Sequence, residues 1–253
     1  MKVTEIIPGS PCWAQLSVRD VPAALDFYGG LFGWRGEPDP DPQFGGYTIF
    51  SYDGAAAAAV APLMNPQQPV MWLLSIATAD IEATSEAAKA AGATLWMGPM
   101  DVADRGKWAL LNDPTGAPFA LWQGGSFAGF GVVNEPNSFG WADLSTRDKD
   151  GATAFYAGVF GWRVWPDENY AMVGLGEDMF GGVMKLDPSV PPEVPSHWAP
   201  YFLVADVDAS AATAARLGGE VLHGPTDVQM ENGPRIAVIR DPQGGTFGIF
   251  APR

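Results

Sequence analysis

The sequence predicts an α+β protein made of two tandem domains, each containing two βαβββ units. The main observation is an internal repeat, because WAQLSVRDVPAALDFYGGLFGWR at 13–35 returns as WADLSTRDKDGATAFYAGVFGWR at 141–163. Within each copy, two rounds of strand, helix and further strands follow one another between turn residues. The length of 253 residues also suits one to two domains of roughly 150 residues.

The repeat offset indicates where the domains meet. Trp13 and Trp141 are 128 residues apart (141 − 13). The offset then changes by a few residues, because Tyr47 corresponds to Tyr170, and it returns to 128 at the later Asp-Pro turns. Such drift indicates surface loops of different length between shared elements. The expected bounds are 1–124 for the first domain, 125–138 for the linker and 139–253 for the second domain.

The first unit begins with a strand that leads into a helix. Residues 13–18 alternate in polarity, which is typical of a strand. Asp20 then stands where a helix N-cap would, and apolar residues recur at helical spacing until Gly33 ends the helix. Two strands are expected to follow, around 47–52 and 55–61.

The second unit repeats this order. Its expected elements are a strand from 71, a helix at 81–91 and strands near 95, at 108–111 and at 119–122. The five alanines at 55–59 favour a helix by propensity, but their repeat partner MFGGV at 179–183 does not. Because the repeats must share a fold, we predict a strand at both places.

Composition excludes several classes of function. The formal net charge is −15, which repels the phosphate backbone of nucleic acids and anionic membrane surfaces. Cys12 is the single cysteine, so no internal disulfide can form. Neither a secretion signal nor an apolar run of about 18 residues is visible. We expect a soluble, cytoplasmic protein that binds no nucleic acid or membrane and is a monomer or a homodimer.

Several motifs together resemble a known family. They are the strand, the Asp cap, the helix that contains FY and ends in FGW, and the D-P-x-G turn before the last strand, DPQG at 241–244. This pattern resembles the vicinal oxygen chelate (VOC) superfamily of glyoxalases, extradiol dioxygenases and bleomycin-resistance proteins. The tandem arrangement is most similar to two-domain actinobacterial members called glyoxalase-like or hydroxylase. The resemblance implies a half-open barrel of mixed sheet in each domain, with the ligand on its concave face.

The resemblance also implies where a divalent metal would be bound. The family's first-strand ligands fall on Trp13 and Trp141, and its terminal glutamates fall on Ala120 and Gly248. None of these side chains can hold a hard cation. The remaining implied positions, which are equally unsuited, are Leu73, Ala199, Ala61 and Met184. We therefore expect no metal ion and no other cofactor.

The residues at these cleft positions become the candidate site. Side chains on one strand face recur every second residue, and an aromatic wall with a few polar groups suits a flat apolar ligand. The expected ligand-binding residues are Trp13, Ser17, Ser75, Trp122, Trp141, Ser145 and Phe250. The alternative is that the tryptophans simply fill each barrel as core. Asp143, opposite Gln15 in the repeat, is expected to have a raised pKa beside Trp141.

Three functions remain open from the sequence. The first is a metal-free protein that binds a small apolar or aromatic metabolite, for sequestration, resistance or carriage. The second is a metal-independent tailoring enzyme of secondary metabolism, a hydroxylase, lyase or isomerase, that uses Asp143 with Gln15 or Tyr201 as acid, base and oxyanion donor. The third is a divalent-metal enzyme of the glyoxalase or dioxygenase type.

Overall fold

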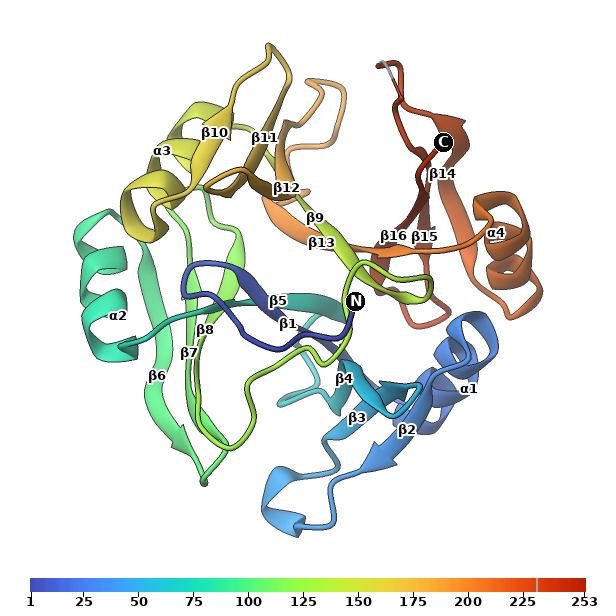
Figure 1. The fold of residues 1–253 in the computed structure, drawn as a ribbon, viewed down its shortest axis with the longest axis horizontal. Coiled ribbons are helices and arrows are strands. Elements are labelled where there is room, and N and C mark those ends of the chain that lie inside the picture. The colour runs from blue at the N-terminus through green and yellow to red at the C-terminus, as the bar shows by residue number, and fades with distance from the viewer. Residues whose placement is uncertain (231) are drawn as a thin grey trace.

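The protein, seen in a computed structural model that describes residues 1–230 and 232–253, contains two curved eight-stranded sheets with helices on their outer faces (Figure 1). The first sheet has the strand order β2-β3-β4-β1-β5-β8-β7-β6. Its elements are β1 (Pro11–Val18), α1 (Val21–Phe32), β2 (Arg35–Pro38), the short 3-10 helix η1 (Pro42–Phe44), β3 (Thr48–Tyr52), β4 (Ala55–Pro62), β5 (Met71–Ala77), α2 (Ile81–Ala90), β6 (Thr94–Val102), β7 (Gly106–Asn112) and β8 (Pro118–Gly124).

The second sheet repeats this topology in the order β10-β11-β12-β9-β13-β16-β15-β14. Its elements are β9 (Ser138–Thr146), α3 (Lys149–Phe160), β10 (Arg163–Trp165), β11 (Tyr170–Leu175), β12 (Asp178–Lys185), β13 (His197–Leu203), α4 (Val207–Arg216), β14 (Glu220–Asp227), β15 (Arg235–Arg240) and β16 (Thr246–Ala251). Neither sheet closes into a barrel, and the predicted α+β tandem fold is confirmed.

Helix boundaries follow the capping signals of the sequence. The carboxylate of Asp20 accepts a hydrogen bond from the backbone N–H of Ala23 at 3.0 Å, and Asp148 does the same for Gly151 at 2.9 Å. Gly33 ends α1 with φ = 71°, a left-handed conformation that glycine adopts at no steric cost. One pair of strands was not located from the sequence, namely β2 and its repeat partner β10, because each is a short edge strand.

The alanine run at 55–59 forms a strand, as the repeat predicted. It begins β4, which pairs in parallel with β1, so that Gln15 lies opposite Ala59. Side chains on the outer face of β1, such as those of Ala14 and Leu16, are fully buried beneath the helices. The inner faces of the two curved sheets are therefore what remains for a ligand.

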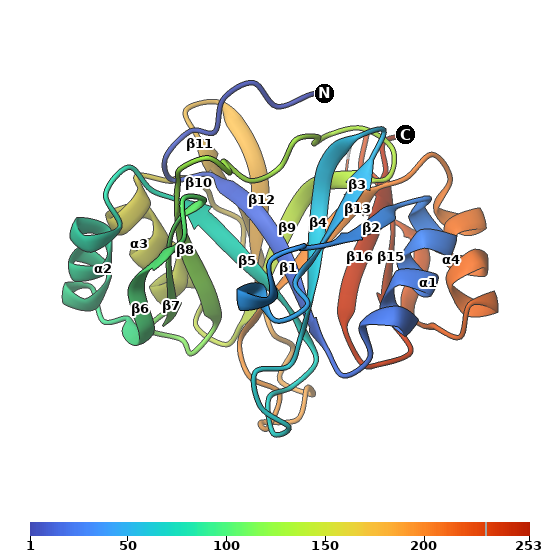
Figure 2. The same ribbon diagram turned by 90° about the horizontal axis from the view of Figure 1, so that it is seen from below.

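The two halves interlock through the motifs that the repeat conserves. The hydroxyl of Tyr28 on α1 donates to Asp241 of the second half at 2.8 Å, and Tyr156 on α3 donates to Asp113 of the first half at 3.0 Å. Helix α1 lies beside α4 and helix α2 beside α3 (Figure 2). In each of these two contacts, the FY motif of one half meets the D-P-x-G turn of the other.

In the part of the chain that the structure describes, none of the helices is long and apolar enough to cross a membrane.

Candidate functional site

The inner face of the second sheet gathers the predicted residues of the second half. Trp141, Asp143 and Ser145 alternate along β9 with the fully buried Ala142 and Leu144, which point to the outer face. Trp141 lies opposite Tyr201 of β13, and Tyr201 in turn lies opposite Gly248 of β16. Phe250 follows two residues further along β16, on the same face.

Asp143 is the centre of a polar cluster on this face. Its Oδ1 accepts hydrogen bonds from the indole Nε1 of Trp141 at 2.9 Å and from the hydroxyl of Tyr170 at 2.8 Å. The indole also donates to the Tyr170 oxygen at 3.0 Å. The hydroxyl of Tyr201 interacts with the same carboxylate. Trp141 and Tyr170 therefore donate to one carboxylate, and Tyr201 of a third strand lies beside it.

Burial sets the protonation behaviour of this cluster. Loss of water around the carboxylate raises the pKa of Asp143 to about 6, although the hydrogen bonds from Tyr170, Trp141 and Tyr201 act in the opposite direction. Burial and the nearby Asp143 charge raise the pKa values of Tyr170 and Tyr201 above the usual 10.0, so both phenols stay protonated donors. The expected rise of the Asp143 pKa thus has a physical cause in the fold.

Two glycines give the tyrosines room to converge. A Cβ atom at Gly182, which lies opposite Asp143, would be 2.0 Å from the Tyr170 hydroxyl oxygen. A Cβ atom at Gly248 would be 2.0 Å from Cδ1 of Tyr201. In the first half, Ala59 stands where the second half has Gly182. The cluster around Asp143 therefore depends on backbone positions that carry no side chain.

The equivalent tryptophan of the first half is covered. Trp13 is only 5% exposed, and its indole donates to the Tyr47 hydroxyl at 2.7 Å. The ring of Phe127 lies edge-on to Trp13 with centroids 5.0 Å apart, and the ring of Phe130 lies 5.4 Å away. Both phenylalanines belong to the segment between the sheets, which folds back over β1. Trp141, by contrast, is only half-buried.

The other predicted residues of the first half lie on the same inner face as Trp13. Ser75 is directly opposite Trp13, and Trp122 is opposite Ala77 on the neighbouring strand pair. Ser17 is also buried on this face. The expected partnership of Gln15 with Asp143 needs correction, because Gln15 pairs with Ala59 and Leu73 in the first sheet. Strand alternation fixed its face, but only the fold shows that the two faces are separate.

Sequence reasoning missed three residues that contact the predicted side chains on the two inner faces. Tyr170 was aligned with Tyr47, yet a matched pair of tyrosines gave no reason to place either one beside a tryptophan. Phe127 and Phe130 lie in a polar, Gly-rich stretch that reads as linker. Their role depends on where that stretch packs, which its composition does not determine.

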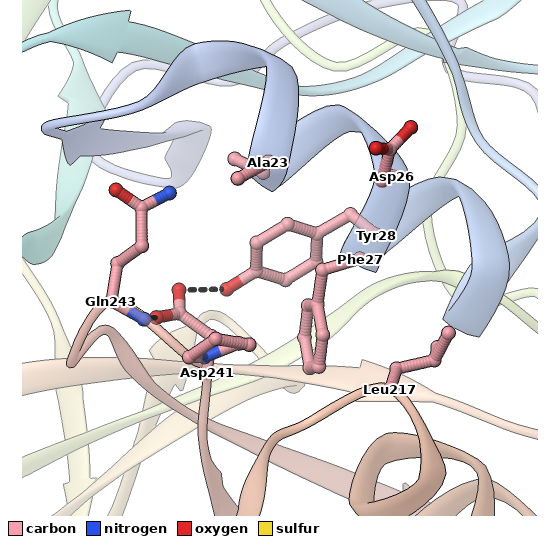
Figure 3. Close-up of a pocket in the computed structure, with 9 residues that line it drawn as sticks. Ala23, Asp26, Phe27, Tyr28, Leu217, Asp241 and Gln243 are labelled. Atoms are coloured by element: carbon pink, nitrogen blue, oxygen red, sulfur yellow. Dashed lines mark hydrogen bonds between the residues drawn. The ribbon is translucent and has the colours of Figure 1, made fainter.

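One cavity lies outside both inner faces, at the contact between the halves. It has a volume of about 260 Å³ and lies between α1 and the D-P-Q-G turn, over the hydrogen bond from Tyr28 to Asp241 (Figure 3). The Asp241 carboxylate already accepts backbone N–H groups from its own turn, and the Gln243 amide is bonded to the backbone of Arg19 and Asp20. The polar groups of its floor are engaged, so we assign this cavity to the seam between the halves.

Comparison with known proteins places this fold in a family. The model of the Glyoxalase/Bleomycin resistance protein/Dioxygenase superfamily matches residues 12–121, and that of the Glyoxalase-like domain matches residues 141–250. The chain belongs to the glyoxalase/bleomycin resistance protein/dioxygenase superfamily. This is the VOC superfamily that the sequence motifs resemble, and both halves are members.

Relatives within the superfamily match over nearly the full length. "Putative glyoxylase CFP32" of Mycobacterium tuberculosis is 37% identical, with 99% of this chain and 98% of the relative covered. The anthracycline biosynthesis proteins DauV of Streptomyces sp. (strain C5) and DnrV of Streptomyces peucetius are each 35% identical, with 99% and 96% covered.

Solved structures of the superfamily share the fold at low sequence identity. The 2,3-dioxygenase LapB from Pseudomonas sp. KL28 superposes with a TM-score of 0.69 at 15% identity, covering 95% of this chain and 91% of that one. The Mn(II)-bound glyoxalase from Novosphingobium aromaticivorans gives 0.68 at 15% identity, covering 99% and 82%.

The superfamily's metal chemistry can be tested against the side chains on the inner face of the second sheet. A catalytic metal needs three or more His, Cys, Asp or Glu ligands, whereas the cluster on the second sheet contains Asp143 as its one carboxylate. Among residues 1–230 and 232–253, no three such side chains converge. The Tyr201 ring also lies over Gly248, where the resemblance places a metal-binding glutamate. The residues present do not fit a divalent metal of the superfamily type.

Proposed function

We propose that the protein binds a small planar aromatic or apolar metabolite in the cleft of its second half, and that no metal ion takes part. The observation that carries this proposal is the difference between the two halves. Trp141 and Asp143 stay partly accessible on the inner face of the second sheet, whereas Trp13 is covered by Phe127 and Phe130.

The cleft offers both stacking surface and hydrogen bonds to such a ligand. The indole of Trp141 and the ring of Phe250 are half-buried apolar surfaces, which favour flat aromatic molecules. The Asp143 carboxylate accepts hydrogen bonds and can orient a ligand that carries a hydroxyl group. The apolar part of the ligand would then pack against the aromatic rings, and its hydroxyl group would donate a hydrogen bond to Asp143.

The relatives support the chemical class. DauV and DnrV are named for anthracycline biosynthesis, and anthracyclines are planar and aromatic. A role in sequestering, carrying or giving resistance to an aromatic product of secondary metabolism is consistent with an apolar cleft that lacks metal ligands.

Matched substitutions in the two halves test this proposal. We expect Trp141→Leu to weaken binding of naphthol, anthraquinone or a dihydroxyanthraquinone about fivefold, because an aromatic contact of about 1 kcal/mol is lost. Isothermal titration calorimetry measures the dissociation constant. Trp13→Leu is the control and should change it less than about twofold, since its indole is covered. Equal effects of both variants, or no binding tighter than about millimolar, would contradict the proposal.

A second candidate function, a metal-independent enzyme, is favoured by the Asp143 cluster. A carboxylate with a pKa of about 6 can act as a general base near neutral pH, and Tyr201 can donate to a developing oxyanion. If so, Asp143→Asn abolishes turnover of a bound compound while its dissociation constant stays nearly unchanged. Activity of the unaltered protein should rise as Asp143 loses its proton around pH 6. Mass spectrometry of the product follows turnover, and unchanged turnover would remove Asp143 from the mechanism.

A further inference from the structure

The two contacts between the halves are equivalent in the repeat, but one turn residue distinguishes them. The D-P-x-G turn of the second half contains Gln243, whereas the turn of the first half has Thr115 at the same place (243 − 115 = 128). The hydroxyl of Thr115 donates to Asp113 of its own turn at 2.8 Å, so its polar group stays within the turn. The two turns therefore present different groups to the half that they face.

Gln243 binds the segment that leads from β1 into α1 through its side-chain amide. The amide oxygen accepts hydrogen bonds from the backbone N–H groups of Arg19 at 3.1 Å and Asp20 at 2.9 Å. The amide nitrogen donates to the backbone carbonyl of Asp20 at 2.7 Å. Figure 3 shows the Gln243 side chain extending from its turn toward α1. One primary carboxamide therefore satisfies both donors and an acceptor of this segment.

A cavity occupies the corresponding space at the other contact. It has a volume of about 270 Å³ and lies between the turn of the first half and the segment that leads from β9 into α3. Its polar lining includes Thr115, Thr146, Arg147 and Asp148. The Thr115 side chain is shorter than that of Gln243 and is bonded within its turn, which leaves this space open.

The backbone groups that Gln243 binds at one contact recur at the other. Arg147 and Asp148 correspond to Arg19 and Asp20 in the repeat. Among the residues whose positions the structure describes, no hydrogen-bond acceptor takes up the backbone N–H of Arg147. The Asp148 carbonyl accepts one N–H from within α3 at 3.0 Å and keeps a second lone pair. A donor and an acceptor are therefore available in the same arrangement that binds the Gln243 amide.

A buried hydroxyl adds a third polar group to this cavity. Thr146, which stands where the first half has Val18, is fully buried and lines the cavity. Its oxygen accepts hydrogen bonds from the Ser196 hydroxyl at 3.0 Å and from the Asp148 N–H at 3.2 Å. Within the described residues, no acceptor is bonded to the proton of the Thr146 hydroxyl. A ligand oxygen in the cavity would supply that acceptor.

The remaining wall of the cavity is apolar and belongs to the loop between β12 and β13. Pro192, Val194 and Pro195 line this side. The guanidinium of Arg147 donates to the backbone carbonyl of Pro191 at 2.7 Å, which holds the loop against the beginning of α3. The volume suits a small molecule, because sites for drug-sized ligands begin at about 300 Å³.

We propose that this cavity binds a small molecule that carries a primary carboxamide and a compact apolar group. The amide oxygen of the ligand accepts hydrogen bonds from the Arg147 N–H and the Thr146 hydroxyl, and its NH₂ group donates to the Asp148 carbonyl. A carboxylate fits less well, because it has no donor for that carbonyl. The site lies on the outer side of the second sheet and does not depend on the function proposed for the inner face.

NMR spectroscopy of the full chain tests which groups bind the ligand. Benzamide is the test compound, and the backbone amide signals of Arg147 and Asp148 are the readout, since these report on this cavity alone. We expect both signals to shift to saturation as benzamide is added. N,N-dimethylbenzamide, which has no N–H to donate, should bind roughly fivefold more weakly. Acetamide, which lacks the apolar group, should bind about tenfold more weakly. Absence of these shifts, or equal binding of benzamide and its dimethyl derivative, would overturn the proposal.

Substitutions taken from the other contact test the cavity itself. Thr115→Gln places the chain's own amide where the repeat has Gln243, so benzamide should no longer shift the two signals. Thr115→Ser leaves the space open and is the matched control, with a dissociation constant within about twofold of the unaltered protein. Thr146→Val introduces the residue found at position 18 and should weaken binding about fivefold through loss of the hydroxyl. Undiminished binding to folded Thr115→Gln or Thr146→Val would contradict the site.

The inner face of the second sheet is tested separately in the same experiment. Trp141→Leu should leave the benzamide shifts of Arg147 and Asp148 unchanged, because its indole lies on the opposite side of β9 from Thr146. A Trp141→Leu variant that loses these shifts would show that the benzamide signal comes from the inner face, and the carboxamide site would be wrong.

Discussion

At the scale of residues, the distinctive feature of this protein is one carboxylate held among aromatic side chains. Asp143 receives hydrogen bonds from Trp141 and Tyr170, yet its pKa is raised to about 6, because removal from water outweighs these bonds. The first half retains the bond between its tryptophan and tyrosine, Trp13 and Tyr47, but has an amide in place of the carboxylate. The exchange of an amide for a carboxylate is therefore one of the differences between the two faces.

The raised pKa of Asp143 predicts how stability depends on pH. Its value of about 6 in the folded state exceeds the model value of 3.8, so folding favours the protonated form. The contribution to stability is fully present below pH 4 and is lost as the pH rises to 6. Asp143→Asn cannot titrate at this position. The free energy of unfolding of this variant, relative to that of the unaltered protein, should therefore increase by on the order of 2 kcal/mol as the pH rises from 4 to 7.

Urea unfolding at several pH values in this range measures the difference between the two proteins. Using the difference cancels the titration of carboxylates elsewhere, such as Asp208 and Asp187, whose pKa values are lowered by their own partners. Two curves that stay parallel from pH 4 to pH 7 would mean that Asp143 titrates normally.

At the scale of elements, the repeat was a better guide than propensity. The alanines at 55–59 were predicted as a strand because the sequence of their repeat partner at 179–183 does not favour a helix. Both segments form strands in the structure. The short edge strands β2 and β10 escaped notice, since three or four residues carry too little periodicity to be recognised. The drift in repeat offset indicated a loop insertion, but where that loop packs depends on its contacts with Arg105, far along the chain.

At the scale of the whole molecule, the two halves are held together by reciprocal contacts. Tyr28 and Asp241 form one, and Tyr156 and Asp113 form the other. Each aspartate is also bonded to backbone N–H groups of its own turn, so the turn and the facing helix are fixed together. The Phe202 ring of the second half packs 5.2 Å from those of Phe32 and Trp34 in the first. The hydrophobic core of each half is therefore completed by side chains of the other.

Removing one reciprocal hydrogen bond should destabilise the whole chain. Tyr28→Phe leaves a buried carboxylate oxygen of Asp241 without its donor, which costs about 1 to 3 kcal/mol. Tyr156→Phe should have a similar effect. Urea unfolding measures the loss, and Tyr52→Phe is the control, because its hydroxyl makes a longer contact of 3.3 Å with Asn137. A loss at Tyr28 no larger than that at Tyr52 would show that the contact contributes little.

The sequence by itself determined the α+β class, the duplication, most helix and strand positions and the face on which each candidate side chain lies. These follow from local periodicity, from capping residues and from comparison of the two copies. Only the tertiary structure decided that Gln15 and Asp143 lie in separate sheets, that Tyr170 reaches Asp143, and that Phe127 covers Trp13. Those contacts join residues far apart in the chain, and their geometry depends on how whole sheets and linking segments pack, which no short stretch of sequence encodes.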